Sequence, residues 1–408
     1  MVNMSDKEKS PKKSTKAKKP LSIYIHVPNT RKLSDYTTFF SIENMEEKQT
    51  DAYVDALCCE ISSYAKKYSK THQVKTIFIG GGEPALLTPV QFHKITNALK
   101  DNFDTEGLEE FTVEVAPDLM SEENLAAWRS SQLPVNRLSV GIASADDIVL
   151  SVLGKSHTAR GGLASLWLAH LFGFENINID FIYGVPVPRE MASAGLARDV
   201  EKEISIMLSD VPFISHISTY AIMPEEGTEI LRKLEYEELY EQGEDESIDE
   251  EYTMNEVLHE HGFKRYEITS WARPGMESAH AQVYWTATKE YLGFGINAAG
   301  LIGNERYENT KDLGMYLLNP DKVAERHIRT NRDIVNDTIM MGLRTTKGVR
   351  FSELKKLGFD IIKERAGQIM ELVNWEVITV TKTKIRATEE GMMVLNVLID
   401  KLEIKEDE

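Results

Sequence analysis

The chain has 408 residues, of which 42% are hydrophobic and 8% aromatic, enough for two domains or one large barrel with an appendage. This composition excludes a disordered, fibrous or disulfide-stapled chain. Acidic residues outnumber basic ones by 65 to 47, and the net charge of −18 repels phosphate backbones, so we expect no nucleic-acid partner. The adjacent cysteines Cys58 and Cys59 are badly placed to form a disulfide, which indicates a reducing cytoplasm.

The first twenty residues hold seven lysines and no apolar run, which predicts a disordered basic tail rather than a signal peptide. No later segment reaches the roughly 20 apolar residues that a membrane span requires, so we expect none. Acidic residues crowd the segment 225–251, where leucines and tyrosines form one apolar stripe. We expect a helix and a loop there that act as a solvated, mobile connection.

The sequence repeats a pattern of a short β-branched stretch, a break at glycine, proline or asparagine, and a longer helical stretch, and six such strands can be counted. They cover 22–28, 76–82, 111–117, 137–144, 177–184 and 216–222. The spacing leaves room for a crossover helix each time, which predicts parallel βα units in an open sheet or a barrel. Because ligands gather at the carboxyl ends of such strands, we expect one common mouth there. Its predicted members are Pro28, the segment 80–84, Glu114, Ser144 and Asp180.

The regular rhythm stops after residue 222, and the last part of the chain has a different pattern. We expect helices over 337–357 and 361–373, a hairpin over 375–381 and 384–387, and a closing helix over 389–402. This order is winged-helix-like, and its acidic surroundings argue against DNA binding. The expected organisation is a tail over 1–20, a barrel over 21–235, a connecting aromatic-rich block over 236–320 and a C-terminal domain over 321–408.

Gly80, Gly81 and Gly82 follow a strand directly, so bare backbone groups stand where a ligand could approach closely. The alternative is a tight strand-to-helix turn with no ligand. Glu114 places a carboxylate near the same mouth, where it could accept hydrogen bonds from a ribose or an amine. Its alternative role is to pair with a neighbouring lysine.

Ordered motifs run nearly from end to end of the chain. They read SIYIHVP at 22–28, IGGGEP at 79–84, RLSVG at 137–141, INIDFIYGVP at 177–186, YLGFG at 291–295 and MGLR at 341–344. Together they resemble the radical S-adenosylmethionine proteins related to oxygen-independent coproporphyrinogen III oxidase, specifically the shorter branch regarded as heme chaperones. The resemblance implies an α/β fold, a partial (β/α)6 barrel of the TIM-like type, followed by a small helical domain.

The chain departs from this family at the cluster motif. Where the family has three cysteines at C-x3-C-x2-C spacing, this chain has Thr30, Ser34 and Thr37. A neutral hydroxyl is a weak ligand, whereas iron–sulfur clusters are held by soft, ionised thiolates. We therefore expect no 4Fe-4S cluster, no other metal and no radical catalysis. The pair Cys58 and Cys59 is one cysteine short of the required three.

The S-adenosylmethionine pocket that the resemblance implies is half retained. Matching positions are Tyr24, Tyr36, Gly80, Gly81, Gly82, Glu114 and Asp180, whereas Glu83 stands for a threonine, Ala143 for a glutamine and Lys155 for an arginine. We count Glu83 among the candidate cofactor contacts. Because the cluster would anchor the ligand, we expect S-adenosylmethionine to bind weakly at best. Glu83 and Lys155 have opposite charges, and we expect them to pair and close the mouth.

A heme-associated motif of the branch, H-N-x-x-Y-W, is present as His280, Tyr284 and Trp285, with alanine in place of asparagine. A neutral imidazole can ligate heme iron and aromatic faces can pack on a porphyrin, so the resemblance implies contact with heme or another tetrapyrrole. The alternative for His280 is a surface or supporting histidine beside a structural Tyr-Trp pair.

The three replaced cysteines and the resemblance together imply a degenerate, cytoplasmic member of the heme chaperone branch that binds or traffics heme or another tetrapyrrole. One alternative is a true enzyme of porphyrin biosynthesis, a coproporphyrinogen dehydrogenase that uses S-adenosylmethionine. The other is an interaction scaffold with an acidic surface. No feature of the sequence indicates a particular protein partner.

Overall fold

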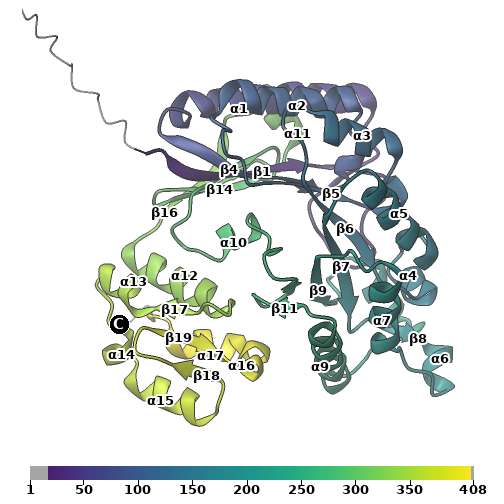
Figure 1. Ribbon diagram of the computed structural model, residues 1–408, viewed down its shortest axis with the longest axis vertical. Helices are drawn as coiled ribbons and strands as arrows, with labels where there is room; N and C mark the ends of the chain where they lie inside the picture. The colour runs from purple at the N-terminus through teal and green to yellow at the C-terminus, as the bar shows by residue number, and fades with distance from the viewer. Residues whose placement is uncertain (1–16, 406–408) are drawn as a thin grey trace, which may run out of the picture.

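A computed structural model describes residues 17–405, which centre on one 12-stranded sheet with helices along its outer face (Figure 1). The strand order is β11-β12-β9-β7-β6-β5-β4-β1-β13-β14-β15-β16. All six predicted strands are confirmed, and neighbours among them pair in parallel. They are β1 (Lys19–Val27), β4 (His72–Gly81), β5 (Glu110–Val115), β6 (Arg137–Ala143), β7 (Asn176–Tyr183) and β9 (His216–Ala221).

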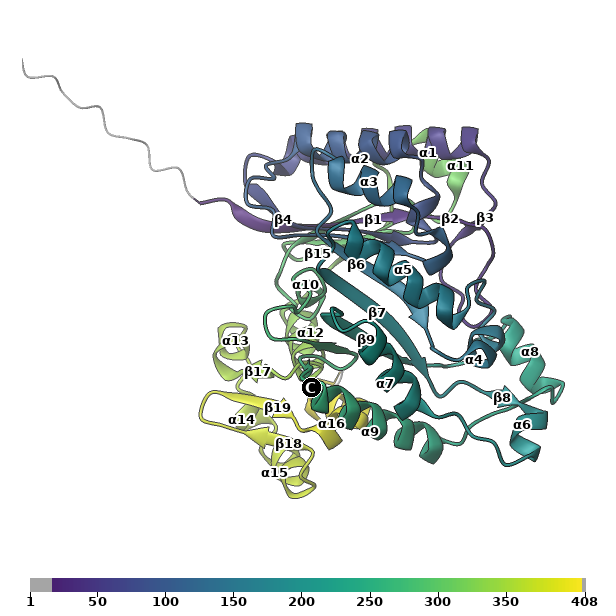
Figure 2. The same cartoon turned by 45° about the vertical axis from the view of Figure 1, so that its right-hand side comes forward.

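A crossover helix follows most of these strands and covers the outer face of the sheet (Figure 2). The long ones are α1 (Glu47–Tyr68), α2 (Pro89–Asn102), α3 (Glu122–Ser130), α5 (Ala159–Leu171) and α7 (Val200–Asp210). Short elements lie between them: β2 (Asn29–Thr30), β3 (Ile42–Glu43), 3-10 turns at Pro84–Leu86 and Pro117–Leu119, α4 (Asp147–Val152), β8 (Val187–Pro188) and α6 (Arg189–Ser193).

Alternation along each strand gives the sheet two chemically different faces. Ile23 and Ile77 are fully buried in the core under the helices. Their chain neighbours Tyr24 and Phe78 therefore point to the inner face, where they lie side by side in register. Glu114 and Asp180 fall on the same inner face of β5 and β7. The barrel interior is consequently polar and aromatic.

The residues expected as a connecting block contribute strands to both edges of the sheet. At one edge, β13 (Tyr291–Phe294) pairs in parallel with β1, and β14 (Ala299–Ile302) and β15 (Glu305–Asn309) follow as antiparallel strands. The same sheet ends in β16 (Val323–Ile328), whose residues were expected in the C-terminal domain over 321–408. At the other edge, β12 (Ser270–Ala272) pairs with β9, and β11 (Lys264–Arg265) pairs with β12. Two short helices complete this block, α10 (Ala281–Tyr284) and α11 (Leu313–Leu318).

The helix and apolar stripe expected over 225–251 are confirmed, but the expected mobile connection is wrong. The segment folds into α8 (Glu229–Glu235), β10 (Leu239–Tyr240) and the start of α9 (Glu244–Glu260). β10 pairs with β8, and Ile230 and Leu239 are buried in a small core. Burial of these apolar side chains outweighs the repulsion among the acidic residues, most of which are exposed. Glu250 and Glu251 are half-buried and bind Gly184 N–H and Arg265.

The C-terminal part forms a second core and a three-stranded antiparallel sheet. Its elements are α12 (Asn331–Leu343), β17 (Val349–Arg350), α13 (Phe351–Lys356), α14 (Ile361–Glu364), α15 (Ala366–Asn374), β18 (Ile378–Val380), β19 (Lys384–Ala387), α16 (Glu389–Met393) and α17 (Leu395–Leu402). The single helix expected over 337–357 is wrong because the chain turns after Leu343. Gly348 has φ +69°, a left-handed conformation that ends the turn and starts β17.

The predicted tail over 1–20 lies mostly outside the described residues. Its last two residues, Lys19 and Pro20, belong to β1. Among the described residues, none of the helices has the length and apolar character needed to cross a bilayer.

Candidate functional site

The three hydroxyls at the cluster positions are each bound to protein groups. Thr30 Oγ1 donates to the Lys32 carbonyl at 2.8 Å, and Thr37 Oγ1 donates to the Glu225 carboxylate at 3.2 Å. Ser34 Oγ accepts the backbone N–H groups of Tyr36 and Thr37, both at 3.3 Å. The three side chains therefore share no common partner.

An ion pair spans the mouth beside these hydroxyls. Arg31 Nη2 lies 2.8 Å from Glu83 Oε1, and Arg31 Nη1 lies 2.8 Å from Asp118 Oδ2. The expected pair of Glu83 with Lys155 is wrong, because Lys155 Nζ instead donates to the Tyr36 hydroxyl at 3.1 Å. Arg31 follows β2, and β2 runs alongside the glycine turn. The Arg31 side chain therefore lies next to Glu83. The one available signal in the sequence was a cation next to the first lost cysteine position.

The glycine turn uses its own backbone amides. Gly81 N–H donates to Glu114 Oε2 at 3.1 Å, Gly82 N–H to the Val27 carbonyl at 2.8 Å, and Glu83 N–H to the Asn29 carbonyl at 2.7 Å. A Cβ at Gly82 would stand 2.5 Å from the Asn29 carbonyl oxygen, so the close approach of these two backbone segments requires glycine here.

Two half-buried carboxyl groups lie on the inner face at the mouth. Burial and, to a smaller extent, the charge of Asp180 raise the pKa of Glu114 to about 7. Burial raises the pKa of Asp180 to about 6, against the hydrogen bond that it accepts from Asn178 at 2.9 Å. Carboxyl groups that titrate near neutrality can exchange a proton with a ligand or accept a hydrogen bond from its amine.

The predicted cofactor and heme residues meet in one aromatic cluster on the inner face. Phe78 stacks on Tyr24 on one side and on His280 on the other, with ring centroids 6.1 and 5.2 Å apart. His280 lies next to α10, is 1% exposed, and uses both ring nitrogens: Nδ1 lies 2.8 Å from Thr76 Oγ1 and Nε2 lies 2.9 Å from the Tyr284 hydroxyl. Burial lowers the pKa of His280 to about 3, so the imidazole is neutral at physiological pH.

Trp285 is separated from its two partners of the predicted heme motif. His280 and Tyr284 are enclosed in the barrel, whereas Trp285 lines a cavity of about 550 Å³ between the segment after α10 and the C-terminal domain. The structure therefore divides the predicted heme contact between two places.

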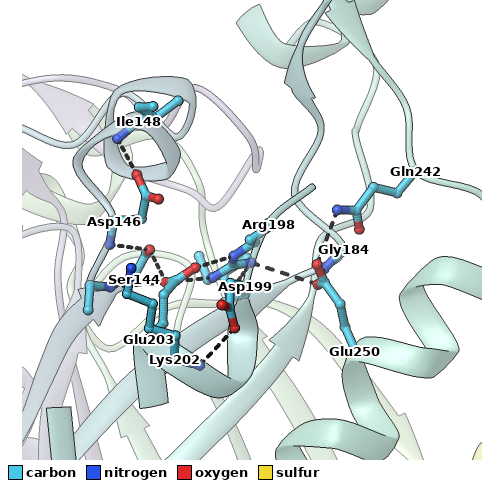
Figure 3. Close-up of polar contacts among 12 residues, drawn as sticks. Ser144, Asp146, Ile148, Gly184, Arg198, Asp199, Lys202, Glu203, Gln242 and Glu250 are labelled. Atoms are coloured by element: carbon cyan, nitrogen blue, oxygen red, sulfur yellow. Dashed lines mark hydrogen bonds and ion pairs between the residues drawn. The ribbon is translucent and has the colours of Figure 1, made fainter. Parts of the chain in front are cut away.

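A buried network that the sequence did not reveal joins the ends of β6 and β7 to α7 and α9 (Figure 3). Arg198, with 1% of its side chain exposed, donates from Nε to Glu203 Oε1 at 2.6 Å and from Nη1 to the Ile182 carbonyl at 2.7 Å. Glu250 accepts the Gly184 N–H at 2.7 Å and lies 3.9 Å from Arg198. Ser144, expected at the mouth, donates to Glu203 instead.

Comparison with known proteins agrees with this architecture. Residues 55–193 match the Radical SAM superfamily, and residues 330–394 match the HemN C-terminal domain. The heme chaperone HemW of Lactococcus lactis is 30% identical over 393 residues, covering 94% of this chain and 97% of the relative. The heme chaperone HemW of Bacillus subtilis is 31% identical over 347 residues, covering 81% and 86%.

The coproporphyrinogen III oxidase HemN of Escherichia coli, a solved radical SAM enzyme, has a similar fold, with a TM-score of 0.79 and 22% identity. The match covers 95% of this chain and 90% of that one. With the motifs above, these matches show that the chain belongs to the radical SAM family, in the branch of HemN and HemW, with Thr30, Ser34 and Thr37 at the three cysteine positions.

Proposed function

We propose that this chain binds or transfers heme or another tetrapyrrole in the cytoplasm without a 4Fe-4S cluster and without radical chemistry. Its curated relatives are named heme chaperones, and the two free thiols of the chain, Cys58 and Cys59, agree with a reducing compartment. The observation that carries the proposal is the chemistry and orientation of the three side chains at the cluster positions.

The donor set at these positions does not fit a 4Fe-4S cluster. The motif would hold three of the four irons, each through an ionised thiolate, and a threonine or serine hydroxyl stays protonated at physiological pH. Thr30, Ser34 and Thr37 also share no common hydrogen-bond partner. The ion pairs of Arg31 with Glu83 and Asp118 join the loop after β1 to the barrel. These ion pairs connect the two segments without a metal.

Weak binding of S-adenosylmethionine is part of the same proposal. The amides of Gly81, Gly82 and Glu83 already donate within the protein, so they are not free donors for a ligand. Glu114 and Asp180 remain as polar groups at the mouth. Binding through these two carboxyl groups alone lacks the chelation of the ligand's amine and carboxylate that a cluster would supply.

Anaerobic reconstitution with iron and sulfide tests the loss of the cluster. We expect the wild-type chain to retain no stoichiometric iron and to lack a thiolate-to-iron absorption band after desalting. The matched control is the triple variant Thr30→Cys, Ser34→Cys, Thr37→Cys, which restores the spacing and leaves the rest unchanged. A brown wild-type protein with an EPR signal after reduction would instead support a radical enzyme.

Hemin titration tests the second half of the proposal. We expect a saturable change in the Soret band of hemin with wild-type protein, at one heme per chain. The titration buffer contains no bovine serum proteins. A heat-unfolded sample of the chain serves as the control for non-specific adsorption of hemin. If hemin spectra with folded and unfolded protein are the same, the chain has no specific heme site and the scaffold alternative is favoured.

A further inference from the structure

The cavity beside Trp285 is strongly basic in an acidic protein. It lies where α10 and the following segment face α12, β17 and α13 of the C-terminal domain (Figure 1). Five of its lining residues are basic and one, Glu353, is acidic. The basic residues are Lys289, Lys347, Arg350, Lys356 and Lys384. The whole chain has a net charge of −18, so this concentration of cations is opposite in sign to the rest of the molecule.

These five cations lack acidic partners. Within residues 17–405, no carboxylate lies within ion-pair distance of any of them. The neighbouring Lys355, on the same helix, pairs with Asp360 at 3.0 Å and does not line the cavity. Burial and, to a smaller extent, the charge of Lys347 lower the pKa of Lys289, whereas the charge of Glu109 raises it. Uncompensated charges of one sign around a cavity attract an anion and are stabilised by it.

Part of the basic wall is fixed in place by hydrogen bonds. Lys347 Nζ donates to the side-chain oxygen of Gln282, and Lys384 Nζ donates to the Lys347 carbonyl at 2.8 Å. Arg350 and Lys356 follow on β17 and α13. Cations whose positions are already ordered lose less conformational entropy when an anion binds.

The cavity also offers apolar surface. Trp285, Val349 and Leu357 line it together with the cations. An indole face can pack on a flat, apolar ring, and the volume of about 550 Å³ is within the range of sites for medium-sized organic ligands. The lining therefore fits a flat, apolar molecule that bears carboxylates.

We propose that this cavity binds the carboxylates of a tetrapyrrole through Arg350, Lys356 and the neighbouring lysines, with the ring against Trp285. This inference rests on the proposed function and specifies how the ligand is held. It removes His280 from the role of iron ligand, because both nitrogens of that imidazole are bonded inside the barrel. Recognition then depends on the carboxylates and not on the metal.

Metal-free protoporphyrin IX and its dimethyl ester test the inference, because the ester has the same ring without carboxylates. We expect the free acid to quench tryptophan fluorescence saturably and the ester to bind about tenfold more weakly, since losing charge-assisted hydrogen bonds costs at least 1.4 kcal/mol. The double variant Arg350→Gln, Lys356→Gln is expected to lose a similar factor. Lys355→Gln, the matched control outside the cavity, is expected to bind like wild type.

The outcomes separate this inference from the proposed function. Suppose that hemin binds the wild type, that the ester binds as tightly as the free acid, and that the double variant binds the free acid as tightly as the wild type does. The proposed heme function then stands, but the cavity is not the binding site. Loss of hemin binding in His280→Ala alone would point to the same conclusion. If neither hemin nor the free acid binds the wild type, both proposals fail. All variants of the basic wall change exposed side chains, and unchanged thermal midpoints would verify their folding.

Discussion

Arg31 and Glu83 contact each other through both the side chain and the backbone of the arginine. Arg31 Nη2 donates to Glu83 Oε1 at 2.8 Å, Nε donates to Oε2 at 3.2 Å, and the Arg31 backbone N–H donates to Oε2 at 2.8 Å. Arg31 follows the first replaced cysteine position, and Glu83 stands where the family motif has a threonine. Their contact joins the loop after β1 to the glycine turn after β4.

Replacing Arg31 with glutamine is expected to loosen this loop. Because 40% of the arginine side chain is exposed, water screens the pair, and we expect a loss of only about 1 kcal/mol in the free energy of unfolding. The clearer signal is limited proteolysis within 30–43, which should become faster. Lys94→Gln, which removes an exposed pair with Asp55, is the control and should leave the cleavage rate unchanged. Equal cleavage of both variants would show that the ion pair does not order the loop.

Replacing Arg198 with methionine is expected to be far more costly. The guanidinium is buried, and its loss leaves the Glu203 carboxylate buried without its cation. Breaking one partner of a buried ion pair costs about 3–5 kcal/mol, measured here as a lower midpoint of urea unfolding. The double variant Arg198→Met, Glu203→Leu removes both charges and should recover part of that loss. A single variant as stable as wild type would refute the structural role of this network.

Glu60 is expected to make stability depend on pH. It is buried without a cation and accepts hydrogen bonds from Gly295 N–H, Asn309 Nδ2 and Tyr316 OH at 2.8, 2.7 and 2.6 Å. Burial raises its pKa from 4.5 to about 8, against these hydrogen bonds. Above pH 4.5 the Glu60 carboxyl group loses its proton in the unfolded chain but keeps it in the folded chain. The contribution of Glu60 to the free energy of unfolding therefore falls as the pH rises towards about 8.

The variant Glu60→Gln isolates this effect, because an amide does not titrate. The wild type should lose about 1.4 kcal/mol of stability per pH unit in that window from this group, and the variant should not. The stability of the variant relative to wild type is therefore expected to improve from about pH 5 to about pH 8. Urea unfolding across this range measures both. Parallel pH profiles would mean that the folded carboxyl group titrates normally.

Gly82→Ala is expected to distort the mouth, whereas Gly141→Ala is not. A Cβ at Gly82 would stand 2.5 Å from the Asn29 carbonyl oxygen, and that backbone cannot move without breaking the hydrogen bond from Glu83 N–H. Overpacking of this kind costs about 1–3 kcal/mol. A Cβ at Gly141 would meet no atom within 4 Å, which makes it the control. Thermal unfolding compares them, and equal midpoints would contradict a close-packed turn.

The sequence by itself determined the six parallel strands, the family and the loss of the three cysteines. These follow from local order: alternation within a strand, glycine and proline at its end, and residue types at fixed spacing. Successive side chains of a strand point to opposite faces, so the placement of Tyr24 and Ile23 on opposite faces of β1 follows from the strand alone, without knowledge of distant contacts.

Only the tertiary structure decided which side chains meet. Glu83 bonds Arg31 and not Lys155, His280 is bound by Thr76 and Tyr284, and Trp285 faces a basic cavity with Arg350 and Lys356. Such contacts join segments far apart along the chain, so no local pattern encodes their distances. The break between α12 and α13 has the same origin, because Gly348 turns where its Cβ would meet the Ile385 carbonyl of β19. Packing against a distant strand decides the left-handed conformation of Gly348. The helical periodicity of the segment therefore does not predict the break between α12 and α13.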